Sequence, residues 1–263
     1  MSDSRTIVTR MGSIAVHVGP HNTALPLVLL HGVYLDRHFW DRQVQALGGR
    51  TVVTLDMPYH GESRGAPRSW TLDDCAGMLI DILDELHFDK VVVVGHSWGS
   101  MTAMRAAVLR PDRFAALGLC NMPLNPGSLP KIVLYQLRAA LLPFRSFYTR
   151  QAAKALYAPE SLAKHPEFVG SLQATMGRLS NSEVRQVDMA VVINPDDGFR
   201  ILRQLNVPAL ALKGVKDYVP EPPGLDLTVV PGGHMSPAES PDAVITFIYR
   251  VLALAEDGLA DQV

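Results

Sequence analysis

The pentapeptide at 95–99, Gly-His-Ser-Trp-Gly, holds the serine whose position most clearly indicates chemistry. An apolar run at 91–94 precedes it directly, and a segment typical of a helix follows it. A serine flanked by glycines at a strand-to-helix turn is typical of a nucleophile elbow, because the turn strains the serine backbone and leaves no room for flanking side chains. We therefore predict that Ser97 presents its hydroxyl as a nucleophile.

A serine hydroxyl needs a general base to take its proton, and an elbow serine is followed along the chain first by an acid and then by a histidine. Two histidines lie beyond Ser97. His165 lies in a polar segment, whereas His234 comes after an apolar run at 227–230. Catalytic groups of parallel sheets follow the carboxyl ends of strands, so we predict His234 as the base.

Asp217 follows the apolar run at 209–212 and is the predicted acid. Asp226 begins a run instead of following one, and Asp196 and Asp197 precede a helical segment, so these three are weaker candidates. The path from Asp217 to His234 is short and rich in proline. We expect an extended crossover without a helix, and Asp217 keeps its place only if that path reaches the histidine.

The oxyanion of an acyl-transfer intermediate needs preorganised donors. The backbone N–H of Trp98 is one candidate, because it begins the helix after the nucleophile and gains from the helix dipole. The N–H of Val33, in the loop after the run at 27–30, is the other, and Gly32 beside it permits a close backbone approach. We expect His31 to hold this loop through hydrogen bonds.

Short, continuous apolar runs alternate with segments that have helical spacing of apolar residues, as in a mostly parallel sheet covered on both faces. The predicted strands are a hairpin at 6–9 and 13–18 and runs at 27–30, 51–55, 91–94, 115–119, 209–212 and 227–230. The predicted helices cover about 36–47, 71–87, 98–110, 198–205 and 241–255. The sequence thus predicts an α/β fold with eight strands.

Residues 125–196 break this alternation, because they are helix-rich and contain no convincing strand. We predict a helical cap at 125–196 inserted into a core formed by 1–124 and 197–263. The cap carries eight Lys and Arg against five Asp and Glu. Apolar residues at helical spacing more often only pack against their neighbours. The side chains that could contact substrate are those of Tyr34, Trp98, Leu124, Phe144, Phe147 and Met176.

The composition fits a small-molecule substrate. With 24 Lys and Arg against 26 Asp and Glu, the chain has no basic field for nucleic acid or an anionic membrane. Cys75 and Cys120 have no metal-ligand spacing and are expected to be buried thiols. The polar N-terminus and the lack of a run of about 18 apolar residues predict a cytoplasmic protein without a membrane anchor. Composition leaves the oligomeric state open.

Taken together, these motifs resemble the α/β-hydrolase fold family. The segments at 30–32 and 56–63, the elbow, and the stretch at 237–241 match its motifs, although Tyr59 stands where members usually have a small residue. The resemblance implies that Ser97, Asp217 and His234 form a catalytic triad and that the N–H groups of Val33 and Trp98 form the oxyanion hole. It implies neither a metal nor a cofactor.

We accordingly predict a serine hydrolase that cleaves a small, largely apolar carboxylic ester or lactone through an acyl-enzyme on Ser97. Dehalogenase chemistry is excluded because it needs an aspartate at the elbow. One alternative is cofactor-free chemistry on the same fold, as in a C–C hydrolase, a perhydrolase or haloperoxidase-like enzyme, a lyase or a dioxygenase. The other is a ligand-binding module with vestigial hydrolysis, since fold alone does not fix function.

Overall fold

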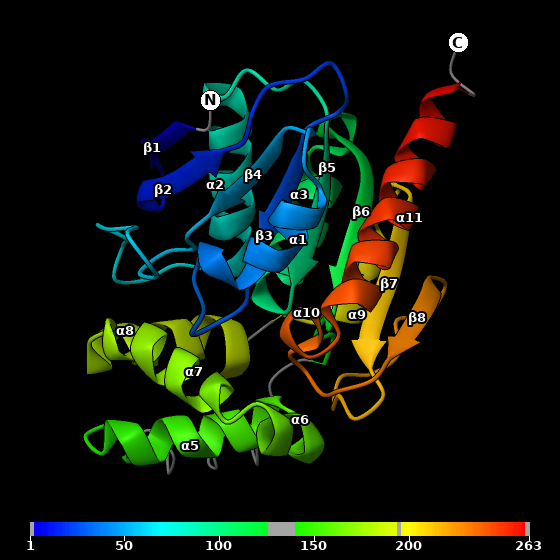
Figure 1. Cartoon of the computed structure of the whole chain (residues 1–263). Coiled ribbons are helices and arrows are strands. Elements are labelled where there is room, and N and C mark those ends of the chain that lie inside the picture. Colours follow the sequence, from blue (N-terminus) through cyan, green and yellow to red (C-terminus); the bar gives the residue numbers. More distant parts are fainter. Residues whose placement is uncertain (1–2, 126–139, 194–195, 261–263) are drawn as a thin grey trace.

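The computed structural model describes residues 3–125, 140–193 and 196–260. One sheet of eight strands forms the centre of the molecule, in the order β1-β2-β4-β3-β5-β6-β7-β8 (Figure 1). Its strands are β1 (Asp3–Thr9), β2 (Gly12–Val18), β3 (Leu27–Leu30), β4 (Val52–Leu55), β5 (Val91–His96), β6 (Phe114–Cys120), β7 (Ala209–Gly214) and β8 (Asp226–Val230).

The strands from β3 to β8 pair in parallel, and β1 and β2 join them as an antiparallel hairpin. Every residue of β3, β4, β5 and β6 is buried, which explains why these strands read as continuous apolar runs. The predicted α/β class and the mostly parallel eight-stranded sheet are confirmed.

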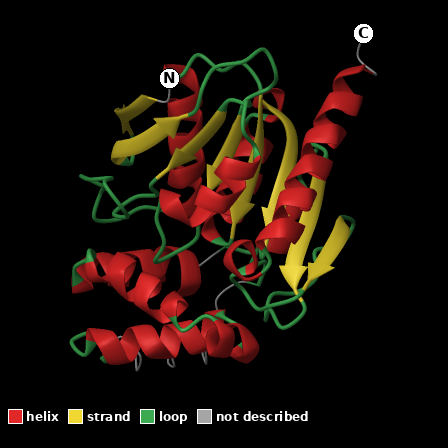
Figure 2. Ribbon diagram, in the orientation of Figure 1, coloured by secondary structure: helices red, strands yellow, loops and turns green. Residues whose placement is uncertain are grey.

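Helices cover both faces of this sheet (Figure 2). On one face, α2 (Leu72–Glu85) and α3 (Trp98–Leu109) form an apolar cluster with the side chains of Val91 and Val93. On the other face, α11 (Pro241–Ala260) forms a second cluster with Val92 and Val94. Successive side chains of a strand point to opposite faces, so β5 contributes to both halves of the core.

Short helices complete the core. They are the 3-10 helices η1 (Arg37–Trp40) and η2 (Pro111–Arg113) and the α-helices α1 (Asp41–Ala46), α9 (Gly198–Leu202) and α10 (Ser236–Glu239). The single helix predicted at about 36–47 is therefore two elements, η1 and α1. The last helix, α11, continues to residue 260, beyond the predicted end at 255.

A group of helices lies beyond the carboxyl ends of the central strands (Figure 1). It consists of α5 (Arg145–Leu156), α6 (Pro159–Lys164), α7 (Glu167–Gly177), α8 (Asn181–Val187) and the π-helix η3 (Asp188–Ile193). A third apolar cluster, which includes Tyr34, Tyr148, Leu172, Met176 and Met235, packs these helices against loops of the core. The described residues between β6 and α9 contain no strand, as predicted.

The connection from β7 to β8, residues 215–225, contains turns and bends but no helix. It nevertheless joins two parallel neighbours, β7 and β8. The extended, helix-free crossover predicted from Pro220, Pro222 and Pro223 is confirmed. In the described ranges, no helix is long and apolar enough to span a membrane.

The helix α3 lies so close to β3 that Gly99 has no space for a side chain. A Cβ atom there would lie 2.2 Å from the Leu30 carbonyl oxygen. We predict that Gly99→Ala lowers the free energy of unfolding by about 1–3 kcal/mol, the usual cost of overpacking. Gly170 is the matched control, because a Cβ atom there would meet nothing within 4 Å.

Gly170 lies within α7, so Gly170→Ala should instead raise stability by about 0.5–1 kcal/mol through helix propensity. Urea unfolding of both variants measures the two effects. Equal stability of Gly99→Ala and the unaltered protein would contradict the close contact between α3 and β3.

Candidate active site

Ser97 lies at the sharp turn between β5 and α3, with φ 52° and ψ −111°. This strained backbone is possible because Gly95 and Gly99 lie against each other: a Cβ on Gly95 would approach the Gly99 carbonyl carbon to 2.4 Å. The turn is the nucleophile-elbow geometry that the sequence predicts. It directs the Ser97 hydroxyl beyond the carboxyl end of β5.

The structure brings the three predicted catalytic side chains together. The Nε2 atom of His234 lies 2.9 Å from Ser97 Oγ, and its Nδ1 atom lies 2.9 Å from Asp217 Oδ1. A carboxylate only accepts, so Nδ1 carries the proton and Nε2 is free to accept the Ser97 hydroxyl proton. All three side chains are buried, with at most 9% of each residue exposed.

Further hydrogen bonds hold Asp217 as an anion. Burial raises the pKa of this carboxyl, but the hydrogen bond and charge of His234 and the bonds from Asn121 and Val219 outweigh burial, so the pKa lies below its ordinary value. Asn121 Nδ2 donates to Asp217 Oδ2 over 2.7 Å, and the backbone N–H of Val219 donates to Oδ1 over 3.3 Å. The acid can therefore orient the histidine in its ionised form.

Sequence reasoning missed Asn121. It is fully buried, has a φ of 51°, and also donates to Ser236 Oγ over 3.0 Å. Only its position in the sequence could have indicated a role, because Asn121 directly follows β6, at the edge of the sheet where catalytic groups lie. An asparagine is one of the few residues that tolerate such a positive φ.

The backbone of His234 is held from two sides. Its carbonyl oxygen accepts a hydrogen bond from His96 Nε2 over 2.7 Å, and its N–H donates to the Leu156 carbonyl over 2.7 Å. The Glu239 carboxylate accepts from the N–H groups of Gly233 and Met235, over 2.8 and 3.1 Å. The imidazole is thus presented from a loop whose backbone groups are paired.

The predicted oxyanion loop lies directly against the nucleophile. A Cβ on Gly32 would lie 3.2 Å from Ser97 Cβ and 2.7 Å from His96 Nδ1, so only glycine permits this approach. The Val33 N–H has no hydrogen-bond partner among the residues that the structure describes. Trp98 begins α3, so its N–H has no acceptor within the helix. Both donors lie on segments that meet at Ser97.

Tyr34 anchors the same loop in three directions. Its N–H donates to His60 Nε2 over 3.0 Å, its carbonyl oxygen accepts from Thr175 Oγ1 over 2.5 Å, and its hydroxyl donates to the Asp188 carboxylate. Its φ of 66° needs such support. Two of the three partners, Thr175 and Asp188, belong to α7 and η3.

Three buried histidines around the site are neutral. Burial is the main cause, and it lowers the pKa of His31 to about 4 and those of His60 and His96 to about 3. His31 Nε2 accepts the N–H of Met57 over 2.9 Å while its Nδ1 donates to the Gly32 carbonyl over 2.7 Å. His31 therefore holds the loop, as the sequence indicates.

The predicted substrate-contact residues differ in exposure. Trp98, Leu124 and Met176 are completely or almost completely buried within apolar clusters. Phe144 is 68% exposed and Phe147 is 44% exposed on the first described turns of the helical group. Substrate contact by these five residues and by Tyr34 stays a prediction.

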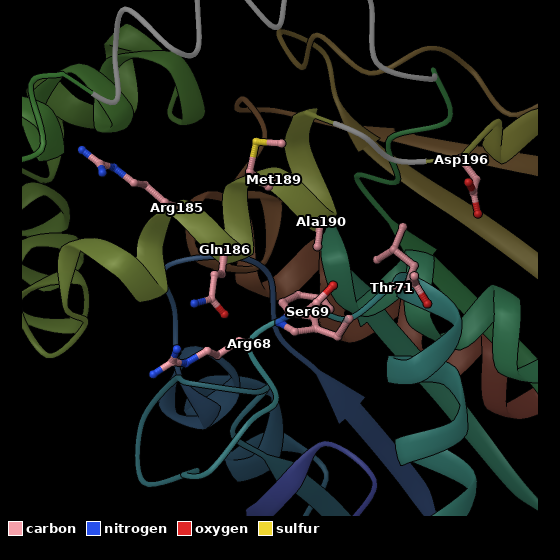
Figure 3. Close-up of a pocket in the computed structure, with 10 residues that line it drawn as sticks. Arg68, Ser69, Thr71, Arg185, Gln186, Met189, Ala190 and Asp196 are labelled. Carbon is pink, nitrogen blue, oxygen red and sulfur yellow. The ribbon is translucent and has the colours of Figure 1, made fainter.

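A pocket of about 420 Å³ lies between the loop before α2 and the helices α8 and η3 (Figure 3). Arg68, Ser69 and Thr71 line it from the loop, and Arg185 and Met189 line it from the helices. Trp70 also lines the pocket, and its ring stacks on that of Trp98 with the ring centroids 5.5 Å apart. One residue of the pocket lining therefore contacts the residue that follows Ser97.

Comparisons with known proteins identify the fold family. The model of the α/β hydrolase fold family matches residues 26–219. The dihydrolipoyllysine-residue acetyltransferase component of the acetoin cleaving system of Pseudomonas putida is 29% identical over 237 residues, which are 83% of this chain but only 61% of that protein.

Two solved structures share the fold. A thermophilic esterase from Thermogutta terrifontis is 26% identical, with a TM-score of 0.83 over 96% of this chain and 99% of its own. An enol-lactonase from Burkholderia xenovorans is 19% identical, with a TM-score of 0.85 over 95% of this chain and 100% of its own. The second likeness shows the fold alone.

The neutral histidines predict how stability depends on pH. In the unfolded chain they take up protons below about pH 6.5, whereas in the folded protein His31 does so only near pH 4 and His60 and His96 near pH 3. The unfolded state therefore binds more protons in this window, and the free energy of unfolding falls as the pH falls. We expect a loss on the order of several kcal/mol between pH 7 and pH 5.

Urea unfolding at a series of pH values measures this slope. Ser171 is an exposed residue of α7 without a titratable group, so Ser171→Ala should leave the slope unchanged. A free energy of unfolding that stays constant from pH 7 to pH 5 would contradict the neutral state of the three buried rings.

Proposed function

The chain belongs to the α/β-hydrolase fold family, and within it we propose that the protein is a serine hydrolase that cleaves a small, largely apolar carboxylic ester or lactone. The observation that carries this proposal is the buried hydrogen-bonded chain from Ser97 through His234 to Asp217, with both distances at 2.9 Å. Such a chain activates a hydroxyl for attack on a carbonyl carbon.

In the acylation step, Ser97 Oγ attacks the carbonyl carbon while His234 Nε2 takes the hydroxyl proton. The Asp217 carboxylate stabilises the imidazolium that forms, without itself taking the proton. The lowered pKa of Asp217 supports this role, because the carboxyl stays an anion that can stabilise the imidazolium. Collapse of the tetrahedral intermediate breaks the bond to the leaving oxygen, which receives the proton from Nε2.

The negative oxygen of the intermediate is stabilised by the N–H groups of Val33 and Trp98. Gly32 supports this assignment, since its contact with Ser97 brings the Val33 segment against the elbow. The N-terminus of α3 adds its dipole. Because both donors belong to backbone that is fixed before substrate arrives, little reorganisation is needed during the reaction.

Water then attacks the acyl-enzyme along the reverse route. His234 Nε2 takes a proton from the water and returns it to Ser97 Oγ, which releases the carboxylic acid and restores the starting state. The proton that leaves Ser97 is carried away on the leaving alcohol, and the proton that returns to Ser97 comes from water, so the three residues end the turnover in the protonation states in which they began.

We further propose that residues 125–196 form a cap over this site, with 1–124 and 197–263 as the catalytic core. The backbone bond from His234 to Leu156 and the hydroxyl bond from Tyr34 to Asp188 support this division, because they join the helices to both sides of the site.

Replacement of the nucleophile or the base should abolish turnover. We predict that Ser97→Ala and His234→Ala each lower kcat by about 10⁴-fold or more on a p-nitrophenyl ester, because each removes a step that the other groups cannot perform. Ser171→Ala, an exposed serine of α7, is the control and should keep full activity. Wild-type rates in either site variant would end the triad hypothesis.

Covalent labelling separates this function from the alternatives that form no acyl-enzyme. A fluorophosphonate should label Ser97 once per chain, and p-nitrophenyl acetate should give a burst of nitrophenolate, because an acyl-enzyme accumulates. Neither signal is expected from a lyase, a dioxygenase or a binding module. Labelling that persists in Ser97→Ala would assign the nucleophile elsewhere.

A substrate screen tests the proposed class. We expect higher kcat/KM for esters of short apolar acids and for small lactones than for peptide amides, with Ser97→Ala as the blank. The measurement is the initial rate across a series of acyl-chain lengths and lactone ring sizes. Preference for a peptide bond over every ester in the series would exclude the proposed substrate class.

A further inference from the structure

A second hydroxyl lies beside the nitrogen that exchanges the proton. Tyr218 follows Asp217 in the loop after β7, and its ring stacks on the His234 imidazole with centroids 4.7 Å apart and planes inclined by 24°. Its hydroxyl oxygen lies 3.5 Å from His234 Nε2, the atom that also contacts Ser97 Oγ. Two hydroxyl groups therefore lie beside the imidazole, that of Ser97 at the elbow and that of Tyr218 in the loop that carries Asp217.

The position of Tyr218 is fixed by its neighbours along the chain. The Asp217 carboxylate accepts the Val219 N–H over 3.3 Å, and the Val219 carbonyl oxygen accepts from Lys213 Nζ over 2.6 Å. The Asp217 N–H donates to the Gly214 carbonyl over 3.0 Å. Because the backbone on both sides of Tyr218 is bonded, the phenol is held over the imidazole.

Tyr218 is nonetheless 62% exposed, although His234 beneath it is only 3% exposed. A tyrosine that only packed would bury most of its ring, whereas this one covers the imidazole with one face and leaves the rest open. Burial of the hydroxyl end raises the pKa of Tyr218, so the phenol keeps its proton and stays a hydrogen-bond donor beside Nε2. The leaving oxygen of a substrate must come within about 3 Å of that same nitrogen to receive its proton.

We propose that Tyr218 is a catalytic residue whose hydroxyl donates a hydrogen bond to the leaving oxygen of the ester as this oxygen takes the proton from His234. The proposal rests on the proposed serine-hydrolase function. During the step the bond from the carbonyl carbon to the leaving oxygen breaks, its electron pair stays on that oxygen, and the proton comes from Nε2. Tyr218 keeps its own proton, so the balance of the reaction is unchanged.

The chemistry of the leaving group makes this role measurable. An alkoxide is a poor leaving group and gains much from a donor, whereas p-nitrophenolate is a stable anion and gains little. Tyr218→Phe removes the hydroxyl and keeps the ring. We expect kcat/KM for the ethyl ester of a given acid to fall about ten- to hundredfold, the worth of one hydrogen bond to a charged oxygen. The p-nitrophenyl ester of the same acid should lose less than about threefold.

Tyr249 provides the matched control. It is 51% exposed, and its hydroxyl donates to the Ala46 carbonyl, away from the three catalytic side chains. Tyr249→Phe should leave both rates unchanged. Thermal unfolding of both variants checks that the exposed position of Tyr218 tolerates phenylalanine without loss of fold.

The outcomes are distinct. Selective loss on the ethyl ester supports the proposal. Equal loss on both esters would mean that the phenol only positions the imidazole, and no loss would mean that it is a surface residue; either result overturns it. Ser97→Ala, assayed on the same two esters, tests the underlying function separately, because retained activity there rejects the serine mechanism whatever Tyr218 does.

Discussion

One imidazole, that of His234, must engage a hydroxyl and a carboxylate at the same time, and most of the surrounding structure serves that requirement. The hydroxyl comes from the end of β5, the carboxylate follows β7, and the histidine follows β8. Parallel pairing brings these carboxyl ends to the same edge of the sheet. The ring then fits between its two partners because backbone bonds to His96 and Leu156 fix its loop.

Backbone strain is concentrated at the same edge. Four non-glycine residues with positive φ directly follow or closely follow successive strands: Tyr34, Tyr59, Ser97 and Asn121 come after β3, β4, β5 and β6. Each such conformation costs roughly 1–3 kcal/mol, so the surrounding contacts must compensate. They do so through the triple anchoring of Tyr34, the glycine contacts around Ser97 and the buried bonds of Asn121. Strain is therefore located where side chains must be aimed at one point.

The sequence predicts the strand-helix alternation, the elbow and the meeting of Asp217 with His234, because each depends on local pattern and on the rule that parallel strands end at one edge. The side-chain partners of those residues depend on contacts between distant segments. Asn121, His96 and Tyr218 carry no motif of their own, and only the folded chain places them against Asp217 and His234. The surface position of Phe144 is equally invisible to an apolar pattern, which does not tell an exposed face from a buried one.

The helices beyond the carboxyl ends of the strands contact both the predicted oxyanion loop and the loop that carries His234. On the side of the oxyanion loop, Thr175 and Asp188 hold Tyr34. On the side of the base, the Leu156 carbonyl accepts the His234 N–H. The Ala158 N–H donates to the Glu239 carboxylate, which also accepts the N–H groups on either side of His234. A displacement of these helices would therefore disturb donor and base together. A molecule that bound against these helices would therefore act on the positions of the proposed oxyanion donor and the proposed base at the same time.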